Sequence, residues 1–347
     1  MHWPLLVVLA QPHVPALTPG CLPADDQIDI WCPGDDGTKC FKIPSLARTV
    51  KGTLLAFVEA RKEQCGDGGI IDLRLRRSVD NGKSWLASQA VVPMSDGNVT
   101  WGDACPVQDR RTGRVHLILT RNNADVFATH SDDDGASWAP PRNISSMVNG
   151  HRPSGQFVGT GHAGGLQLRS GRLLVPLHGP CRMVYSDDGG YTWALAPGAL
   201  SAGGECQAVE LRSGLLLATA RNGKAGFTYL ARSRDQGMTW DGSVANRDLP
   251  SPIDGCEASM VVHPNGRLYH SSPDSHLLRN RMVVRESADD GRTWRVHERV
   301  WPASAGYSSM IVLGNDTNAA LGVLYDRNNV SMIIFEARGV TFTTVSP

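Results

Sequence analysis

Charged residues at matching positions of repeated segments are the first feature of this sequence that could do chemistry. Arginine ends four apolar, strand-like segments, at Arg61, Arg121, Arg221 and Arg327. An arginine at the end of a buried strand faces either solvent or a bound anion, because its guanidinium stays charged. Arg61 and Arg221 each lie beside a different acid-bearing segment, so for these two we favour an anion-binding site.

A carboxylate-rich octapeptide occurs five times. The copies "SVDNGKSW", "SDDDGASW", "SDDGGYTW", "SRDQGMTW" and "SADDGRTW" begin at residues 78, 131, 186, 233 and 287, and all fit S-x-D-x-G-x-[S/T]-W. A single copy could be a metal loop, a catalytic site or a turn. A catalytic site is rarely needed five times, and "DDDG" at 132–135 lacks the downstream glutamate of an EF-hand loop. The pattern predicts a structural fold-back in which Asp, Gly and the hydroxyl form a turn and Trp packs beside the next strand.

The elements that position these residues are expected to be strands. Each octapeptide follows a short apolar or alternating run, and repeats at this spacing are typical of propellers or solenoids. Six further segments share a strand–turn–Gly–strand pattern, at residues 41–61, 104–121, 162–179, 205–222, 257–273 and 307–327. Together they predict an all-β, six-bladed propeller whose last blade is completed by N-terminal residues.

Equivalent positions of a propeller gather at one end of its central axis. We therefore expect Lys42, Glu205 and Tyr307 to be neighbours although they are far apart in the sequence. The residues at or next to the starts of the six first strands are Lys42, Ala104, His162, Glu205, Glu257 and Tyr307.

Composition excludes some classes of function. Lys+Arg and Asp+Glu are equal at 34 each, which disfavours nucleic-acid binding. No stretch of about 18 apolar residues occurs, so no transmembrane helix is expected.

We interpret residues 1–20, with an apolar run ending in Val8-Leu9-Ala10, as a signal peptide or N-terminal segment and residues 28–347 as a single domain. Eight cysteines, whose pairing stays open, and sequons at Asn98, Asn143, Asn315 and Asn329 support a secretory route.

Three other signals are set aside. "GTGHAG" at 159–164 fits G-x-G-x-x-G, but a strand pattern follows it, which disfavours a dinucleotide site. Cys206, next to Glu205, could be a nucleophile, although a buried thiol or half of a disulfide is favoured. The eleven histidines show no metal-ligand spacing.

Several motifs together resemble the sialidase family. "FKIPSL" at 41–46 is similar to the F/Y-R-I-P motif of sialidases, and the octapeptides are similar to their Asp boxes. "LLAFVEAR", "ECQ…ARN", "RNRMVVR" and "WPASAGYSSM" extend the resemblance over residues from about 40 to 330, closest to lysosomal-type animal sialidases. The resemblance implies a six-bladed propeller that removes terminal sialic acids from glycoproteins, gangliosides and oligosaccharides. It also implies that no metal or organic cofactor is needed, and a location in the lysosomal lumen or outside the cell.

The resemblance further implies a site for the substrate carboxylate. The family holds that carboxylate with three arginines, of which the second and third match Arg221 and Arg279. The first matches Lys42, and the glutamate that braces it matches Asp326, so this sequence departs from the family at both positions. Arg61 matches the arginine of the pocket for the acetamido group and O4.

Catalytic roles follow from the same resemblance. Glu205 and Tyr307 match the nucleophilic pair, and Asp67 matches the acid/base on a mobile loop, in preference to Asp72. A carboxylate nucleophile would be repelled by the substrate carboxylate, whereas a neutral tyrosine is not. Because a tyrosine with a pKa of about 10 is a poor nucleophile near neutral pH, Glu205 must accept its proton. Asp67 protonates the leaving oxygen and later activates water, so two displacements give net retention.

Alternatives to a hydrolase stay open. One is a sialic-acid-binding lectin on a sialidase scaffold with weakened catalysis, which the departures at Lys42 and Asp326 would suit. A second is a protein-binding propeller without enzyme activity, and a third is transfer of sialic acid instead of hydrolysis.

Overall fold

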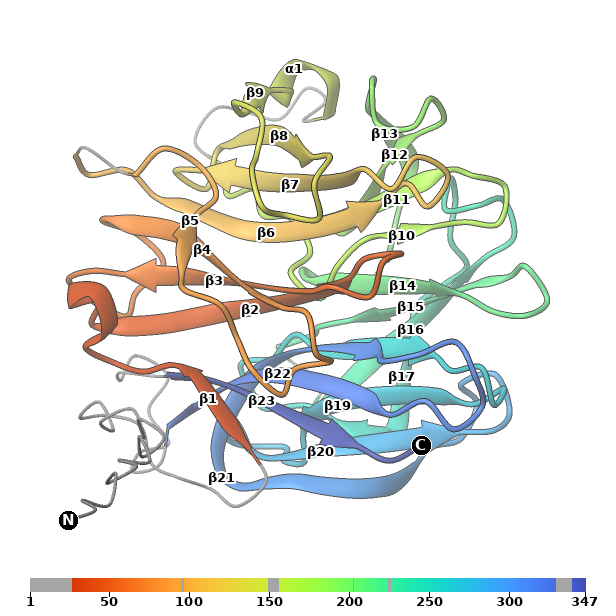
Figure 1. Cartoon of the computed structure of the whole chain (residues 1–347). Coiled ribbons are helices and arrows are strands. Elements are labelled where there is room, and N and C mark those ends of the chain that lie inside the picture. Colours follow the sequence, from red (N-terminus) through yellow and green to blue (C-terminus); the bar gives the residue numbers. More distant parts are fainter. Residues whose placement is uncertain (1–26, 95–96, 149–155, 202, 224–225, 329–338) are drawn as a thin grey trace, which may run out of the picture.

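The computed structural model describes residues 27–94, 97–148, 156–201, 203–223, 226–328 and 339–347. Its antiparallel sheets follow one another along the chain in a propeller-like arrangement (Figure 1). The expected signal peptide in residues 1–20 and the sequon at Asn329 lie outside the described residues. In the described part of the chain, no helix is long and apolar enough to cross a membrane.

Four of the sheets contain four strands each, in chain order. Their strands are β2 (Cys40–Arg48), β3 (Leu54–Arg61), β4 (Ile71–Ser78) and β5 (Gln89–Ala90); β6 (Trp101–Gln108), β7 (Val115–Arg121), β8 (Asp125–Ser131) and β9 (Arg142–Asn143); β10 (Leu166–Gln167), β11 (Leu173–Leu177), β12 (Arg182–Ser186) and β13 (Ala194–Ala199); and β14 (Cys206–Glu210), β15 (Leu216–Ala220), β16 (Phe227–Ser233) and β17 (Val244–Pro250).

A further sheet joins seven strands in the order β1–β23–β22–β21–β20–β19–β18. β21 is long because its first part pairs with β20 and its second part with β22. The strands of this sheet are β1 (Ile28–Trp31), β18 (Ser259–Val262), β19 (Leu268–Pro273), β20 (Asn280–Ser287), β21 (Arg295–Val312), β22 (Leu321–Asn328) and β23 (Gly339–Val345). Pairing of β1 with β23 confirms that N-terminal residues complete the last part of the fold (Figure 1). Helical structure in the described residues is limited to α1 (Ser145–Val148) and the 3-10 turn η1 (Asp35–Gly37).

The expected hairpins are present at all six positions. Each apolar segment, its glycine-containing turn and the following segment form an antiparallel pair, as period-2 patterns with turn residues predict. The pairs are β2–β3, β6–β7, β10–β11, β14–β15, β18–β19 and β21–β22. The all-β class predicted from sequence is therefore confirmed.

The hydrophobic core lies between neighbouring sheets. Five buried clusters each combine apolar side chains from two adjacent sheets. Hydrogen bonds also join neighbouring first strands: the N–H of Leu46 donates to Ser309 Oγ at 2.9 Å and the N–H of Met310 donates to Ser259 Oγ at 2.9 Å. This packing holds the starts of the first strands, and the side chains they carry, in a defined arrangement.

The five octapeptides fold into the same hydrogen-bonded turn. In each copy the first Ser donates to the Asp carboxylate and accepts from the Gly N–H, and the carboxylate accepts from the backbone and hydroxyl of the residue four positions on. The aromatic ring then packs against the preceding sheet, as Trp85 does on Phe342 at 5.3 Å and Trp138 does on Phe57 at 5.7 Å. These contacts give each carboxylate a structural function.

We expect the Asp289→Ala substitution to destabilise the fold without changing the site. Asp289 accepts hydrogen bonds from Ser287 Oγ at 2.8 Å, Thr293 N at 2.9 Å and Thr293 Oγ1 at 2.7 Å. Losing them should lower the free energy of unfolding by about 1–3 kcal/mol. Thermal melting followed by circular dichroism measures this change, with Glu298→Ala, an exposed carboxylate on β21, as the control. If the variant melts normally but loses the activity implied by the resemblance, the turn belongs to the active site and is not only structural.

Candidate active site

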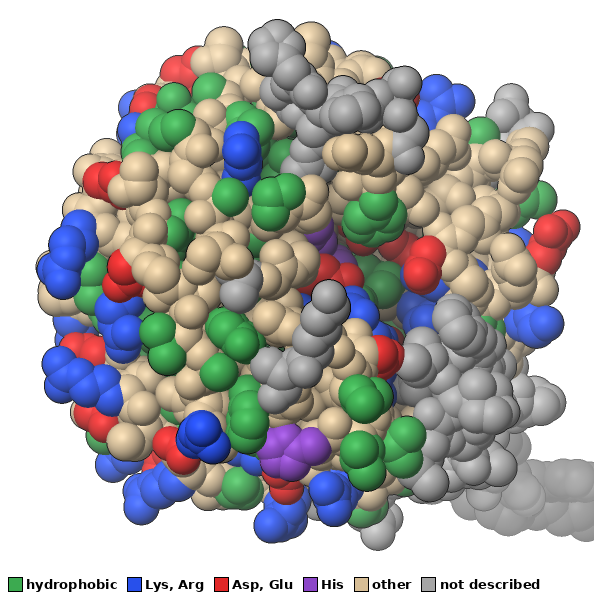
Figure 2. Space-filling model, turned by 180° about the vertical axis from the view of Figure 1, so that it is seen from behind, with side chains coloured by type: hydrophobic (Ala, Val, Ile, Leu, Met, Phe, Trp, Pro, Cys, Tyr) green, Lys and Arg blue, Asp and Glu red, His purple; other side chains and the backbone are tan. Residues whose placement is uncertain are grey.

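A pocket of ≈ 190 Å³ opens where the first strands of different sheets begin. Figure 2 shows a hollow on this face in which acidic, basic and histidine side chains gather. The residues that line the pocket are Lys42, Ile43, Glu59, Arg61, Asp67, Asp103, Asn123, Phe157, His162, Glu205, Arg221, Asp254, Arg279 and Tyr307. The predicted neighbours Lys42, Glu205 and Tyr307 therefore share one pocket.

β-Bulges set the direction of two of the pocket strands. The register of β2 shifts between Lys42 and Ser45, where Ile43 has φ 58°, and the register of β6 shifts between Gly102 and Cys105, where Asp103 has φ 53°. A positive φ is costly for a side chain such as isoleucine and marks a conformation that the surrounding structure enforces. Bulges re-aim side chains at the ends of strands, and Lys42, Ile43 and Asp103 all line the pocket.

Glu205, Tyr307 and Arg221 form a closed set of hydrogen bonds. The Tyr307 hydroxyl donates to Glu205 Oε1 at 2.6 Å, and Arg221 Nη1 lies 2.6 Å from both Glu205 Oε2 and the Tyr307 oxygen. Glu205 and Arg221 meet because they flank the β14–β15 hairpin, where the N–H of Arg221 donates to the Glu205 carbonyl at 2.8 Å. Tyr307 reaches them from β21, a strand of another sheet.

The surroundings of these side chains favour an ionised Glu205 and a neutral Tyr307. Burial would raise the pKa of Glu205, but the charges of Arg221 and His162 outweigh burial and lower the pKa to about 2. Burial and the adjacent Glu205 raise the pKa of Tyr307 well above its ordinary value. The phenol is therefore protonated and hydrogen-bonded to an ionised carboxylate, the starting state that proton transfer from Tyr307 to Glu205 requires.

A second arginine extends the cationic wall beside Tyr307. Arg279 Nη2 donates to the Gly255 carbonyl at 2.9 Å and lies 3.3 Å from Asp254 Oδ2. The Asp254 carbonyl also accepts from Arg221 Nη2 at 2.7 Å, so one turn braces both guanidinium groups. Two fixed guanidinium groups beside one tyrosine can hold a carboxylate with defined orientation.

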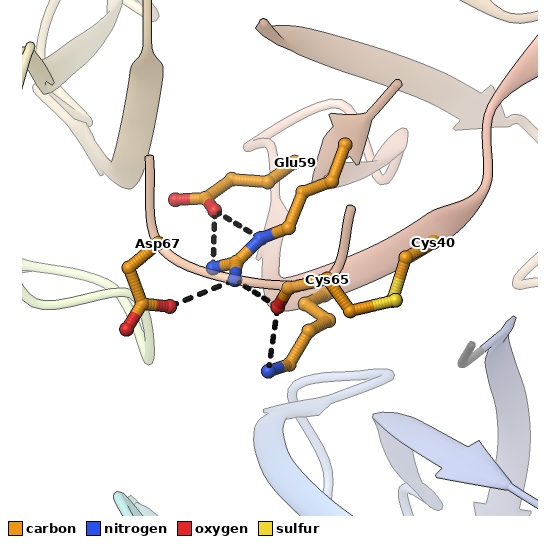
Figure 3. The surroundings of a disulfide bond; sticks show 6 residues. Cys40, Glu59, Cys65 and Asp67 are labelled. Carbon is orange, nitrogen blue, oxygen red and sulfur yellow. Dashed lines mark hydrogen bonds and ion pairs between the residues drawn. A yellow bond between two sulfur atoms is a disulfide. The ribbon is translucent and has the colours of Figure 1, made fainter. Parts of the chain in front are cut away.

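Arg61 and Asp67 also line the pocket. Figure 3 shows Asp67 and Glu59 beside the Cys40–Cys65 disulfide. Arg61, at the end of β3, donates from Nε and Nη2 to Glu59 Oε2 at 3.0 and 2.7 Å and from Nη1 to Asp67 Oδ1 at 2.7 Å. The Asp67 side chain is 68% exposed, on a loop that the Cys40–Cys65 disulfide ties to β2. Partial burial would raise the pKa of Asp67, but the charge of Arg61 outweighs burial and lowers it.

Lys42 lies close to Arg61 in the pocket. Its Nζ donates to the Cys65 carbonyl at 3.4 Å, and Arg61 Nη1 donates to the same oxygen at 2.8 Å. Asp326, expected to brace Lys42, accepts a hydrogen bond from the Gly306 N–H at 2.9 Å, directly before Tyr307. Its bracing of Lys42 therefore stays a prediction.

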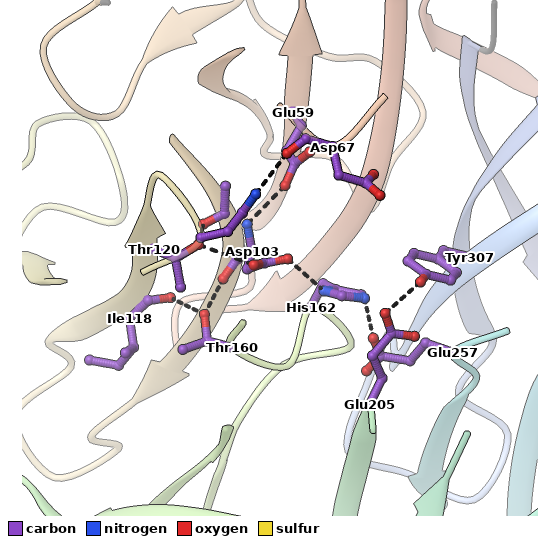
Figure 4. Close-up of polar contacts among 12 residues, drawn as sticks. Glu59, Asp67, Asp103, Ile118, Thr120, Thr160, His162, Glu205, Glu257 and Tyr307 are labelled. Carbon is purple, nitrogen blue, oxygen red and sulfur yellow. Dashed lines mark hydrogen bonds and ion pairs between the residues drawn. The ribbon is translucent and has the colours of Figure 1, made fainter. Parts of the chain in front are cut away.

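A buried histidine at the pocket wall connects two acids (Figure 4). His162 Nδ1 lies 3.5 Å from Asp103 Oδ1, and Nε2 forms an ion pair with Glu257 Oε2. The His162 ring stacks on Tyr307, with 4.8 Å between centroids and 18° between planes. Burial opposes a charge on His162, but Glu257 and Asp103 outweigh it and raise its pKa well above the ordinary value.

One group of described residues has the spacing of a metal site. The ligand atoms of His162, Glu205 and Glu257 lie within 4.8 Å of one another. All three are already engaged: His162 with Glu257, and Glu205 with Tyr307 and the guanidinium of Arg221 at 2.6 Å. Because that guanidinium opposes a second cation at Glu205, we assign no metal to this group.

Comparison with known proteins identifies the family of this chain. A family model described as a BNR repeat-like domain matches residues 52–323. A "Sialidase" of Bacteroides fragilis (strain YCH46) is 27% identical over 88% of this chain and 63% of its own length. "Sialidase-2" of Rattus norvegicus is 27% identical over 85% of this chain and 91% of its own length. The chain belongs to the sialidase family of BNR repeat-like proteins.

The fold of this chain is also similar to solved structures. The "Hadza microbial sialidase Hz136" superimposes with a TM-score of 0.79 at 24% identity, over 92% of this chain and 68% of that chain. The chain spans less than two thirds of the length of the Bacteroides fragilis relative, at 63%. Lys42 lies before the part of the chain that the family model matches, and the other expected site residues up to Tyr307 lie within it.

The structure distinguishes alternatives that the sequence pattern left open. Arg121 is exposed and lies over Trp101 with 5.7 Å between Cζ and the ring centroid, and Arg327 pairs with Asp29 of β1 at 2.7 Å. Neither lines the pocket, so the strand-end arginines do not share one function. Asp72 is buried on β4 and lies 3.6 Å from Lys62, whereas Asp67 lines the pocket.

Some features of the structure were missed or left open by the sequence. Cys206 forms a disulfide with Cys181, as favoured over a nucleophilic role. Gly161, in "GTGHAG", lies where an added Cβ would be 2.9 Å from Pro176, so close packing accounts for this glycine. Asp103 was missed, although it directly precedes the aligned position Ala104, and His162 marked a strand start without an assigned role.

Proposed function

We propose that this chain is a retaining exo-alpha-sialidase that hydrolyses terminal sialic acids of glycoproteins, glycolipids and oligosaccharides through a tyrosyl-sialoside intermediate. The observation that carries the proposal is the contact of Tyr307, Glu205 and Arg221 at 2.6 Å in a pocket that also contains Arg279, Arg61 and Asp67. Membership of the sialidase family supports it.

The proposed chemistry assigns each charge a task. Arg221 and Arg279 bind the substrate carboxylate, with Lys42 as the third cation, and Arg61 lies toward the acetamido group and O4. Glu205 takes the phenol proton as the Tyr307 oxygen attacks the anomeric carbon, and Asp67 gives a proton to the leaving oxygen. Asp67 then activates water for the second displacement. Apart from the substrate and water, these steps use only side chains of this protein.

We also propose six blades, with the seven-stranded sheet counted as two. One blade would contain β18, β19, β20 and the first part of β21, and the other the second part of β21 with β22, β23 and β1. A buried cluster joins these two parts as other clusters join separate sheets. Contacts that run from β21 through β2, β6, the β10–β11 hairpin, β14 and β18 back to β21 support a closed ring.

The cysteines support a secretory or lysosomal location. Disulfides join Cys40 to Cys65 and Cys181 to Cys206, and such bonds persist in oxidising compartments.

The direct test is release of fluorophore from 4-methylumbelliferyl sialoside over about pH 4 to 7. Turnover that first liberates the α-anomer of sialic acid, observed by NMR, is the expected result. Binding of sialyllactose without turnover would replace the proposal with the lectin alternative. If lactose is added as an acceptor, the formation of sialylated lactose in place of free sialic acid would instead indicate transfer.

We expect the Lys42→Arg substitution to increase kcat/KM by about 10-fold or more, because a guanidinium forms the two-pronged bond to a carboxylate that an ammonium cannot. Adding Asp326→Glu should increase it further, and Lys42→Ala should decrease it. Steady-state kinetics on the sialoside measures the three variants. If the Arg and Ala variants both match the unmodified chain, Lys42 does not bind the carboxylate.

A further inference from the structure

His162 contacts the proposed nucleophile but has no role in the steps described above. Its ring lies against the ring of Tyr307 with centroids 4.8 Å apart, and only 3% of the side chain is exposed. One face of the imidazole therefore lies against the phenol, and the surrounding side chains bury the rest of the ring. A histidine in this position can influence the phenol only through packing or through its charge.

The surroundings of His162 favour its charged form. Nε2 pairs with Glu257, whose side chain is 2% exposed, and Nδ1 faces Asp103 Oδ1 at 3.5 Å. Both ring nitrogens must carry protons to satisfy two carboxylates, which makes the ring an imidazolium. Thr120 Oγ1 donates to Asp103 Oδ2 at 3.1 Å, so this acid is itself held in place.

The other titratable groups near His162 add to this balance. Glu205 contributes a negative charge, and the buried His178 ring lies edge-on with 5.4 Å between centroids. Burial lowers the pKa of His178, so it does not add a competing charge. Tyr307 is neutral before reaction, and Arg221 and Arg279 lie beyond it, with Cζ atoms 6.0 and 5.0 Å from its ring centroid.

We propose that His162 is a positioning residue that holds a positive charge, supplied by its pairing with Glu257 and Asp103, against the ring of Tyr307. That charge stabilises the negative oxygen that develops while Tyr307 attacks. The inference rests on the proposed function, because it assigns Tyr307 the nucleophilic role.

The step balances without a further reagent. The O–H bond of Tyr307 breaks and its proton passes to Glu205, while the phenol oxygen forms a bond to the anomeric carbon. The glycosidic C–O bond breaks with its electron pair going to the leaving oxygen, which receives the proton of Asp67. His162 keeps both of its protons throughout.

The two arginines do not make this charge redundant. In the proposed complex the guanidinium groups of Arg221 and Arg279 share their charge with the substrate carboxylate. The charge of His162 instead faces the ring of Tyr307 from a buried side chain, and buried charges act in a low dielectric. It is therefore available when the phenol oxygen becomes negative.

The first test is His162→Phe, which keeps a stacked ring and removes the charge. We expect kcat/KM on 4-methylumbelliferyl sialoside to fall about 30-fold, with the Kd for free sialic acid changed less than about 3-fold. The charge of His162 also helps to lower the pKa of Glu205, so the pH profile should move toward higher pH. His270→Phe is the control, because His270 is a buried histidine outside the pocket that packs on Trp294.

Glu257→Gln provides the second test if His162→Phe does not fold. Removing the Glu257 charge lowers the pKa of His162, whose imidazolium is then lost as pH rises through the new value. We expect kcat/KM to match the unmodified chain near about pH 4.5 and to fall by at least 10-fold toward neutral pH. A residue that served only packing would give the same ratio at every pH.

Two results would overturn the inference alone. One is that the unmodified chain is active and the His162→Phe variant folds, yet the kcat/KM of the variant stays within about 2-fold of the unmodified value. The other is a Glu257→Gln variant whose ratio to the unmodified chain stays flat with pH. An unmodified chain that turns over no sialoside would overturn the proposed function, and with it the role of His162.

Discussion

Replacing Tyr307 with Phe should reduce kcat/KM by about 1,000-fold or more, because the variant keeps the ring but lacks the oxygen that attacks. The stacking on His162 would be preserved, while the hydrogen bonds to Glu205 Oε1 and from Arg221 Nη1 would be lost. Steady-state kinetics measures the loss. A fluorinated sialosyl inactivator supplies the second measurement, since it should add one sialosyl group to the peptide that contains Tyr307.

The matched control for this prediction is Tyr325→Phe. Tyr325 is fully buried and its hydroxyl donates to Gln27, but it does not line the pocket. This variant should retain its activity and its labelling. Label found on Glu205, or full activity in Tyr307→Phe, would contradict the tyrosyl intermediate.

Replacing Asp67 with Ala should reduce kcat/KM on sialyllactose by about 100- to 10,000-fold and on 4-methylumbelliferyl sialoside far less. The sugar alkoxide needs a proton to leave, whereas the phenolic leaving group departs more readily without one. The ratio of the two effects therefore identifies the proton donor. Glu63→Gln, an exposed acid on the same loop, should leave the ratio unchanged.

The dependence on pH tests the same assignment. The pKa of Asp67 is lowered mainly by Arg61, against the effect of partial burial. The fraction of Asp67 that is protonated, and can act as an acid, therefore decreases as pH rises above the pKa of Asp67. As a result, kcat/KM on sialyllactose should fall toward neutral pH by up to about tenfold per pH unit. The Asp67→Ala variant should lose this slope. If Asp72→Asn shows the leaving-group effect instead, the acid is Asp72.

The local elements of this protein could be predicted from the sequence because their causes are local. The turn around Asp289 depends on Ser, Asp, Gly and Thr within seven residues, and the octapeptide contains all of them. The hairpins depend on alternation and on turn glycines, which are also visible in the sequence. Periodic recurrence of both patterns then indicated the all-β class and the proximity of Lys42, Glu205 and Tyr307.

The surroundings of the strand-end arginines could not be predicted from the sequence. Arg61, Arg121 and Arg327 occupy similar positions at the ends of β3, β7 and β22, yet they contact Asp67, Trp101 and Asp29 respectively. Sequence position alone cannot distinguish them, because the partner of each guanidinium comes from another part of the chain. Only Arg61, of these three, lies in the pocket.

The sequence by itself determined the strands, the turns and the residue types that meet at the starts of the first strands. The tertiary structure decided which side chains enter the pocket and which charges oppose one another there. Bulges at Ile43 and Asp103 change the direction of two strands, and a shift of one residue moves a side chain to the other face. The pairing of His162 with Asp103 and Glu257 needs three separate segments to be placed within a few ångströms. Such contacts depend on the packing between sheets, and no short-range pattern in the chain records them.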